Sequence, residues 1–224
     1  MEKEGRRNDM PAYTRGEELF NMISHIVGGG LGVVALLACV IIAAYHQNVW
    51  GIVSGMVYGF SVILLFTMSS LYHGLRMGLP KRVFRVLDHC AIPVLIAGTY
   101  TPMLLTRFRE AYPEHAWMLF GVVWALALAG IVLNVVNLRK FIVLSVVCYL
   151  GMGWMLMFNI GQLVGVLGLA FFVMLLIGGI LYTVGVLFYA LGKRVRYMHS
   201  VFHVFVIAAS AMHSVAIAMY AMPA

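Results

Sequence analysis

Long uninterrupted runs of apolar residues, separated by short polar stretches, dominate the hydrophobic pattern along the chain. Each run holds about 18 residues or more, which is the length that a helix needs to cross a bilayer. The alternation of polar and apolar positions that is typical of membrane β-barrels is absent. The pattern therefore predicts an all-α bundle of seven transmembrane helices, at residues 21–45, 49–73, 87–106, 116–137, 141–159, 162–190 and 198–221.

Composition supports this interpretation. The chain is 63% hydrophobic and only 10% charged, whereas an ordinary soluble domain is about 25% charged. Residues 1–20 are polar and charged and lack the features of a cleaved signal peptide. We therefore expect a short cytoplasmic segment, residues 1–20, followed by one membrane domain, residues 21–221. Within the sixth span, the pair Gly178-Gly179 is a possible kink.

The basic residues are distributed unevenly between the expected loops. Of the 15 basic residues, 13 fall in the N-terminal segment and in the loops after the second, fourth and sixth spans. The other side of the membrane would carry only Arg107 and Arg109. Because cytoplasmic loops are enriched in Lys and Arg, the N-terminus is expected in the cytoplasm and the C-terminus outside the cell. Nucleic acid binding is not indicated, since the charges are split among short loops.

This topology brings several polar residues to the same depth in the membrane. His73 ends the second span, Asp88 opens the third, and His199 and His203 lie near the start of the seventh. At the start of the first helix, three further polar residues share one face, at i, i+3 and i+7: Glu18, Asn21 and His25. Ionisable groups are costly inside a membrane, so their convergence at one level predicts a functional site.

The residue types in this layer suggest a metal centre. Histidines at i and i+4 share one helix face, and three imidazoles leave the fourth position of a tetrahedral zinc open for water, as in catalytic sites. We expect His73, His199 and His203 to bind Zn²⁺. Asp88 could orient the water, accept its proton or hold a histidine tautomer, and Ser69 could donate a hydrogen bond to a substrate carbonyl. Glu18, Asn21 and His25 are expected to support these residues.

Structural explanations of the same residues remain open. A pair of histidines four apart in an apolar helix commonly serves packing or hydrogen bonding between helices. Glu18 could simply favour the start of a helix. His213 lies about 15 Å along the helix from His203, too far to share its metal, and is expected to be a hydrogen-bonded core residue. Three cysteines without a CxxC spacing are expected to fill the core: Cys39, Cys90 and Cys148.

The spaced set of polar residues resembles the progestin and adipoQ receptor superfamily, and most of all its bacterial haemolysin III branch. The resemblance covers residues 15–221 and is carried by Glu18-x-x-Asn21-x-x-x-His25, Ser69-x-x-x-His73, Asp88 and His199-x-x-x-His203. It implies seven helices with a cytoplasmic N-terminus, zinc held by His73, His199 and His203, and Asp88 in contact with the zinc through water. It also implies a multi-pass protein of the plasma membrane, here the inner membrane of a bacterium.

Two classes of function follow from the resemblance. Adiponectin receptors are described as ceramide hydrolases, so one expectation is a zinc-dependent hydrolase of a lipid amide, with membrane lipids as its partners and a link to membrane homeostasis. The alternative is a non-enzymatic protein, either a sensor of membrane state or a cytolytic, haemolysin-like factor. No span carries a continuous polar stripe, which argues against a simple pore. The sequence indicates no protein partner.

Overall fold

The computed structural model describes residues 10–11 and 13–223, and this part of the chain is helical without strands. The elements are α1 (Arg15–Tyr45), α2 (Val49–Gly74), α3 (Leu79–Met103), the π-helical turn η1 (Leu104–Phe108), α4 (Arg109–Ala111), α5 (Pro113–Trp154), the 3₁₀ turn η2 (Met155–Asn159), α6 (Ile160–Leu167), α7 (Leu169–Leu191), α8 (Met198–Ala216) and the π-helical turn η3 (Ile217–Ala221). The all-α class is therefore confirmed.

Within the described residues, six helical stretches are long and apolar enough to cross a membrane, where seven spans were expected. The difference lies in one stretch, Pro113–Leu167, which contains both the fourth and the fifth expected spans in a single run of 55 residues. Its backbone leaves helical geometry at Asn137, with φ −164° and ψ 87°.

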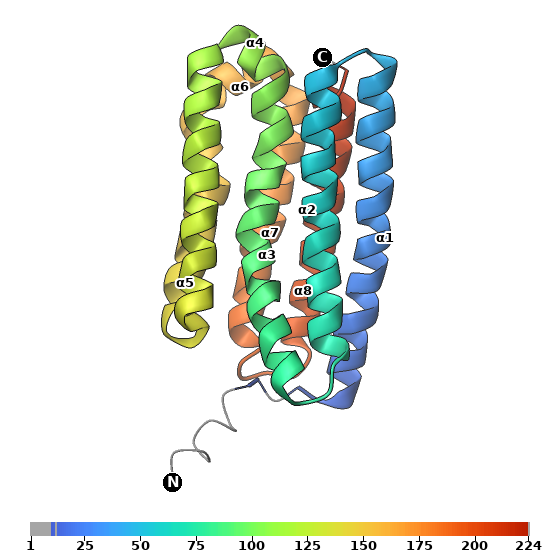
Figure 1. Ribbon diagram of the computed structural model, residues 1–224, viewed down its shortest axis with the longest axis vertical. Coiled ribbons are helices and arrows are strands. Elements are labelled where there is room, and N and C mark those ends of the chain that lie inside the picture. The colour runs from blue at the N-terminus through green and yellow to red at the C-terminus, as the bar shows by residue number, and fades with distance from the viewer. Residues whose placement is uncertain (1–9, 12, 224) are drawn as a thin grey trace.

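The chain reverses its direction at Asn137. In one straight helix, Asn134 and Tyr149 would lie about 22 Å apart. Instead, the Asn134 Nδ2 donates to the Tyr149 hydroxyl over 2.6 Å, and the Ser145 hydroxyl donates to Asn134 Oδ1 over 3.0 Å. The two arms of α5 therefore lie side by side, as its ribbon in Figure 1 shows.

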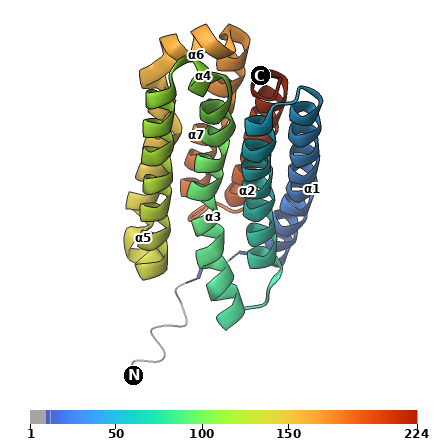
Figure 2. The same cartoon turned by 45° about the horizontal axis from the view of Figure 1, so that its top comes forward.

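Three long helices run up and down next to one another at the start of the chain, with α1 against α2 and α2 against α3 (Figure 1). α8 packs against both α1 and α7, and the short α6 lies across one end of the bundle (Figure 2). The Asn48 Nδ2, in the turn after α1, donates to the Met222 carbonyl over 3.1 Å. The end of the chain and the start of α1 therefore lie at opposite ends of the bundle.

Glycines allow the close approach of α1 and α2. Inside a bilayer the hydrophobic effect does not drive helices together, so they associate through close packing at small residues. A Cβ atom added to Gly59 of α2 would lie 2.7 Å from the Cα of Leu36 in α1. At Gly28 of α1, it would lie 2.6 Å from the ring of Phe66 in α2. Side chains at these positions would force the two helices apart.

Two helices begin earlier than the apolar runs suggest. α1 starts at Arg15 instead of residue 21, because Thr14 and Glu17 form a reciprocal capping box. The Thr-x-x-Glu spacing is a recognisable signal of a helix start. α3 starts at Leu79 instead of residue 87, with Pro80 in its first turn, where the missing N–H of proline costs nothing. Residues 79–86, expected in a loop, are therefore helical.

The expected kink at Gly178-Gly179 is wrong, because α7 continues through both residues. The interruption lies at Gly168, whose φ of +86° is readily adopted only by glycine. Gly178 has a different role, since a Cβ atom there would overlap the imidazole of His213. As expected, His213 is a hydrogen-bonded core residue, and its Nε2–H donates to the Leu175 carbonyl over 3.1 Å.

Candidate metal centre

The structure brings together the three histidines that were expected to bind metal. His73 lies at the end of α2, while His199 and His203 lie in the first turns of α8. Each offers one ring nitrogen, and these three atoms lie within 4.8 Å of one another. All three residues are buried, with at most 7% of their surface exposed. Three buried ring nitrogens at this spacing could hold a metal ion.

The spacing between the two histidines of α8 suits a tetrahedral ion. Their Nε2 atoms are 3.1 Å apart, and two nitrogens bound to one tetrahedral zinc at about 2.0–2.1 Å would be separated by roughly 3.3 Å. Two imidazole nitrogens at such a distance repel unless a proton or a cation lies between them. The contact is therefore consistent with a shared ion.

Glu18 of α1 determines which nitrogen of His73 is available. The His73 Nδ1–H donates to Glu18 Oε2 over 2.6 Å, so Nε2 keeps its lone pair. Hydrogen bonding of a ligand histidine to a carboxylate is the usual means of orienting it toward a metal. From the sequence, Asp88 was one candidate for this orienting function, whereas in the structure Glu18 makes the contact with His73.

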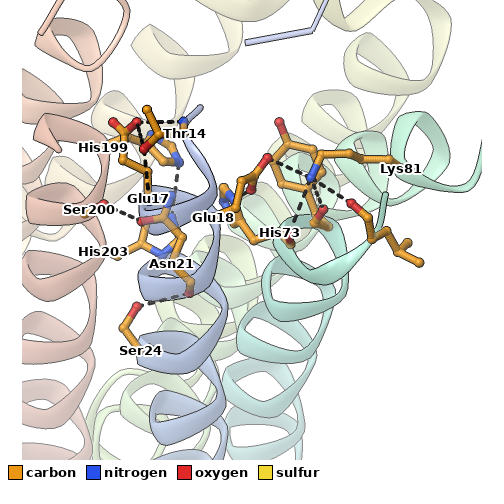
Figure 3. A network of polar contacts seen from close by, with 12 residues as sticks. Thr14, Glu17, Glu18, Asn21, Ser24, His73, Lys81, His199, Ser200 and His203 are labelled. Carbon is orange, nitrogen blue, oxygen red and sulfur yellow. Dashed lines mark hydrogen bonds and ion pairs between the residues drawn. The ribbon is translucent and has the colours of Figure 1, made fainter. Parts of the chain in front are cut away.

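A buried lysine that the sequence analysis did not select completes this arrangement. Lys81 of α3 is only 2% exposed, and its Nζ lies 2.8 Å from Glu18 Oε1. Figure 3 shows Glu18 between His73 and Lys81. In the sequence, Lys81 counts among the basic residues of the loop after the second span. Only the early start of α3, at Leu79, could have indicated that Lys81 lies in a helix.

Asn21 and His25 join α1 to α8 beside the three histidines. The Ser200 hydroxyl donates to Asn21 Oδ1 over 2.7 Å, and the imidazole of His25 stacks on that of His203 with ring centroids 3.7 Å apart. Together with Glu18, which accepts a hydrogen bond from His73, these residues lie beside the three histidines.

The site has an unusual concentration of unpaired polar atoms. Among the described residues, eight buried side-chain nitrogen or oxygen atoms have no hydrogen-bond partner, and five of them belong to this cluster: Asn21 Nδ2, both ring nitrogens of His25, His73 Nε2 and His203 Nδ1. An unsatisfied buried polar group costs about 1–3 kcal/mol. The donor set therefore fits a cluster that is completed by a metal ion and its other ligands.

Asp88 and Ser69 lie near the histidines without joining the group of three nitrogens. The Asp88 side chain interacts with that of Ser69. Both residues line one cavity of about 210 Å³, together with His25, His199 and His203. A carboxylate and a hydroxyl next to the histidine cluster are positioned to contact a ligand or water in that cavity.

The cavity extends from this polar end into the apolar interior. It reaches Met103 on α3 and Leu175 on α7, and the rise along α3 from Asp88 to Met103 amounts to about 22 Å. A long apolar cavity with a few polar groups at one end is suited to an amphiphilic ligand.

Tyr13, which was also not selected from the sequence, covers the histidines at the N-terminal side. Its ring lies 5.7 Å from that of His73, measured between centroids, and it lines the cavity. Burial raises the pKa of the Tyr13 phenol above its ordinary value, so the hydroxyl is protonated at neutral pH. A lone tyrosine ahead of a helix carries no signal of such a contact.

Comparison with known proteins finds relatives that match most of the chain. Residues 13–214 match the model of a family described as haemolysin-III related. Hemolysin-3 of Bacillus cereus is 38% identical over 207 residues, which are 92% of this chain and 93% of that protein. A hemolysin-3 homolog of Bacillus subtilis is 38% identical over 199 residues, covering 89% and 92% of the two chains. The human monocyte to macrophage differentiation factor is 26% identical over 193 residues, 83% of this chain and 78% of that protein.

Proposed function

Because this chain belongs to the haemolysin-III-related family of multi-pass membrane proteins, we propose that it is a zinc-dependent hydrolase of a lipid amide, such as a ceramide-like lipid. The observation that carries the proposal is the cluster of unpaired histidine nitrogens at one end of a long apolar cavity. The cluster supports a metal ion, and the cavity supports a lipid as the substrate.

In this proposal, His73, His199 and His203 hold the zinc ion. When bound, zinc polarises a carbonyl group and lowers the pKa of water. Asp88, a general base that lines the same cavity, would accept the proton of the water whose oxygen attacks the amide carbonyl. It would return this proton to the amide nitrogen as the C–N bond breaks, which releases the fatty acid and the amine. The Ser69 hydroxyl, beside Asp88, donates a hydrogen bond to the substrate and holds the amide in place. Both roles need a group that faces the cavity, and both residues do.

The apolar part of the cavity accepts the acyl chain. Its lining is mostly apolar, with residues such as Leu95, Ile96 and Met103, so it selects mainly for chain length and shape. The partners of this protein are therefore membrane lipids.

We further propose seven membrane crossings, with the N-terminus in the cytoplasm. The two arms of α5 on either side of Asn137 each serve as one crossing, which raises the six candidate stretches to seven. An odd number is supported by the hydrogen bond between Asn48 and Met222, because Asn48 follows the end of α1 and the start of α1 lies at the other end of the bundle. The distribution of basic residues favours the cytoplasmic side for the histidine cluster, in a bacterial cell membrane.

The proposal is tested by purifying the protein, measuring its zinc content, and assaying the release of fatty acid from ceramide and acyl-amide lipids in liposomes. We expect about one zinc per chain and release of fatty acid from at least one lipid. Protein that is fully loaded with zinc and releases no fatty acid would refute the enzymatic function. Leakage of the liposomes without hydrolysis would instead support lysis, the activity that the name of the Bacillus cereus relative suggests.

A further inference from the structure

Lys81 is the most deeply buried lysine of the described chain and lies next to the three histidines, where its Nζ is 3.5 Å from the backbone carbonyl of His73. Its side chain reaches back from the first turn of α3 toward the end of α2, where it is 2% exposed. Burial of a lysine is costly unless the ammonium group is paired and fully hydrogen-bonded. Its contacts therefore indicate what the buried charge is used for.

The ammonium group of Lys81 has three close oxygen partners, and the His73 carbonyl lies farther away at 3.5 Å. Its Nζ lies 2.8 Å from Glu18 Oε1 and donates to the carbonyls of Tyr72 over 2.9 Å and Leu75 over 3.1 Å. Tyr72 belongs to the last turn of α2 and Leu75 is its C-cap, where carbonyls lack partners within the helix. Lys81 is thus fixed to the same turn that carries His73.

Glu18 transmits this contact to the metal centre. One of its oxygens binds Lys81, and the other accepts the Nδ1–H of His73 over 2.6 Å. A carboxylate held by a cation on one side can rotate only by giving up that contact. The ammonium group therefore fixes the direction in which Glu18 presents its second oxygen, and hence the orientation of the His73 ring.

We propose that Lys81 is a positioning residue of the metal centre. Through Glu18, it holds His73 in the tautomer and orientation in which Nε2 faces His199 and His203. This inference rests on the proposed binding of zinc. Lys81, Glu18 and His73 come from three different helices. Together they form a chain of charge-assisted hydrogen bonds that preorganises a ligand before the ion binds.

The proposal is tested by measuring the Kd for Zn²⁺, by competition with a chelator, in the full-length protein in detergent. Loss of a group that orients a metal ligand typically weakens binding by about 10–100-fold, and we expect Lys81→Met to raise Kd by that factor. Asn134→Ala is the matched control, because it removes a buried polar side chain whose hydrogen bonds go to Tyr149, Ser145 and the His89 carbonyl and to none of His73, His199 and His203. It should leave the Kd unchanged.

A double-mutant cycle separates positioning from simple stabilisation of α2. If Lys81 acts through Glu18, Lys81→Met should have little further effect on Kd in a Glu18→Gln background. An equal rise in both backgrounds, or a Kd for Lys81→Met within about twofold of wild type, a difference well below the expected effect, would overturn the inference. If Lys81→Met does not fold, Lys81→Gln allows the same comparison, because it removes the charge but keeps N–H donors. A wild-type protein that binds no zinc would refute the metal centre itself.

Discussion

The ring of Tyr13 stacks on that of His199, with centroids 4.8 Å apart and an angle of 24° between the planes. The residue just ahead of α1 thus covers one face of the metal centre. The neighbouring Thr14 and Glu17 form the capping box of α1, and Glu17 Oε1 also accepts the backbone N–H of Tyr197 over 2.7 Å. The segment that carries Tyr13 is therefore anchored at the start of both α1 and α8.

We predict that Tyr13→Ala lets zinc leave faster. Without the ring, His199 is exposed to water and chelator at the N-terminal side, so the rate of zinc loss to an excess of chelator should rise several-fold. Tyr13→Phe should behave like the wild type, since the contact is made by the ring. Tyr45→Ala is a suitable control, because Tyr45 is 83% exposed at the far end of α1. Equal rates for Tyr13→Ala and Tyr45→Ala would show that Tyr13 does not protect the site.

The three clustered histidines give a second prediction. His73→Ala or His199→Ala should remove zinc from the purified protein, because two remaining imidazoles hold the ion far more weakly than three. His213→Ala should retain it, since His213 bonds to Leu175 and lies away from the cluster. The measurement is zinc per chain by elemental analysis. Full zinc content in a variant that lacks His73, His199 and His203 would contradict the assignment.

Whether a residue of this centre could be predicted from the sequence depends on where it lies along its helix. His73, His199 and His203 were found because the ends of apolar runs set the depth of a residue in the membrane. Lys81 was not, because a lysine near a helix end has the same sequence pattern whether it faces water or folds back onto a carboxylate. Its pairing with Glu18 is set by the turn between α2 and α3, whose geometry hydropathy does not encode.

The fold, too, has features that the sequence predicts and features that it does not. Apolar runs predicted all the long helices and a boundary after residue 137, where the backbone leaves helical geometry at Asn137. The break at Gly168, inside the expected sixth span, is a local backbone event of a single residue. Gly178-Gly179 suggested a kink by composition, whereas tertiary packing against His213 uses Gly178 inside a regular helix. The hydrophobic pattern indicates which segments are helical, whereas single residues and contacts between helices determine where the helices bend.

The orientation of the bundle is a third prediction. A cysteine placed at Arg76, an exposed residue between α2 and α3, should be protected from a membrane-impermeant thiol reagent in intact cells and should react after lysis. A reporter fused after the C-terminus should be active only outside the cytoplasm. A Cys148→Ser background removes the least buried native thiol, since Cys39 and Cys90 are buried. The reverse labelling pattern would place the histidine cluster on the outer side.

Helix packing gives a fourth prediction. Gly59→Ala should destabilise the protein, because its new Cβ atom would lie 2.7 Å from the Cα of Leu36, and backbone cannot yield easily. Overpacking of this kind costs about 1–3 kcal/mol. Gly121→Ala is the control, as nothing lies within 4 Å of its added Cβ atom, and the better helix propensity of alanine should leave it as stable or more so. Thermal unfolding in detergent distinguishes the two. Equal melting temperatures would mean that α1 and α2 are less closely packed than described.

The last prediction concerns the chemistry of Asp88. Asp88→Asn keeps the size and hydrogen-bonding capacity of the side chain but cannot accept a proton from water. Because Asp88 is not one of the three histidine ligands, the variant should fold and keep its zinc while hydrolysis of the lipid amide falls. Loss of a general base typically costs about 10²–10⁴-fold in rate. Ser69→Ala should cost less, since it removes one hydrogen bond from the substrate.

The measurement is fatty-acid release per zinc-loaded protein in liposomes, with Ser54→Ala as a control, because Ser54 is a buried serine of α2 that bonds only to its own helix. Equal rates for the wild type and Asp88→Asn would exclude Asp88 as the base, and a simultaneous loss of zinc would instead assign it to holding the ion.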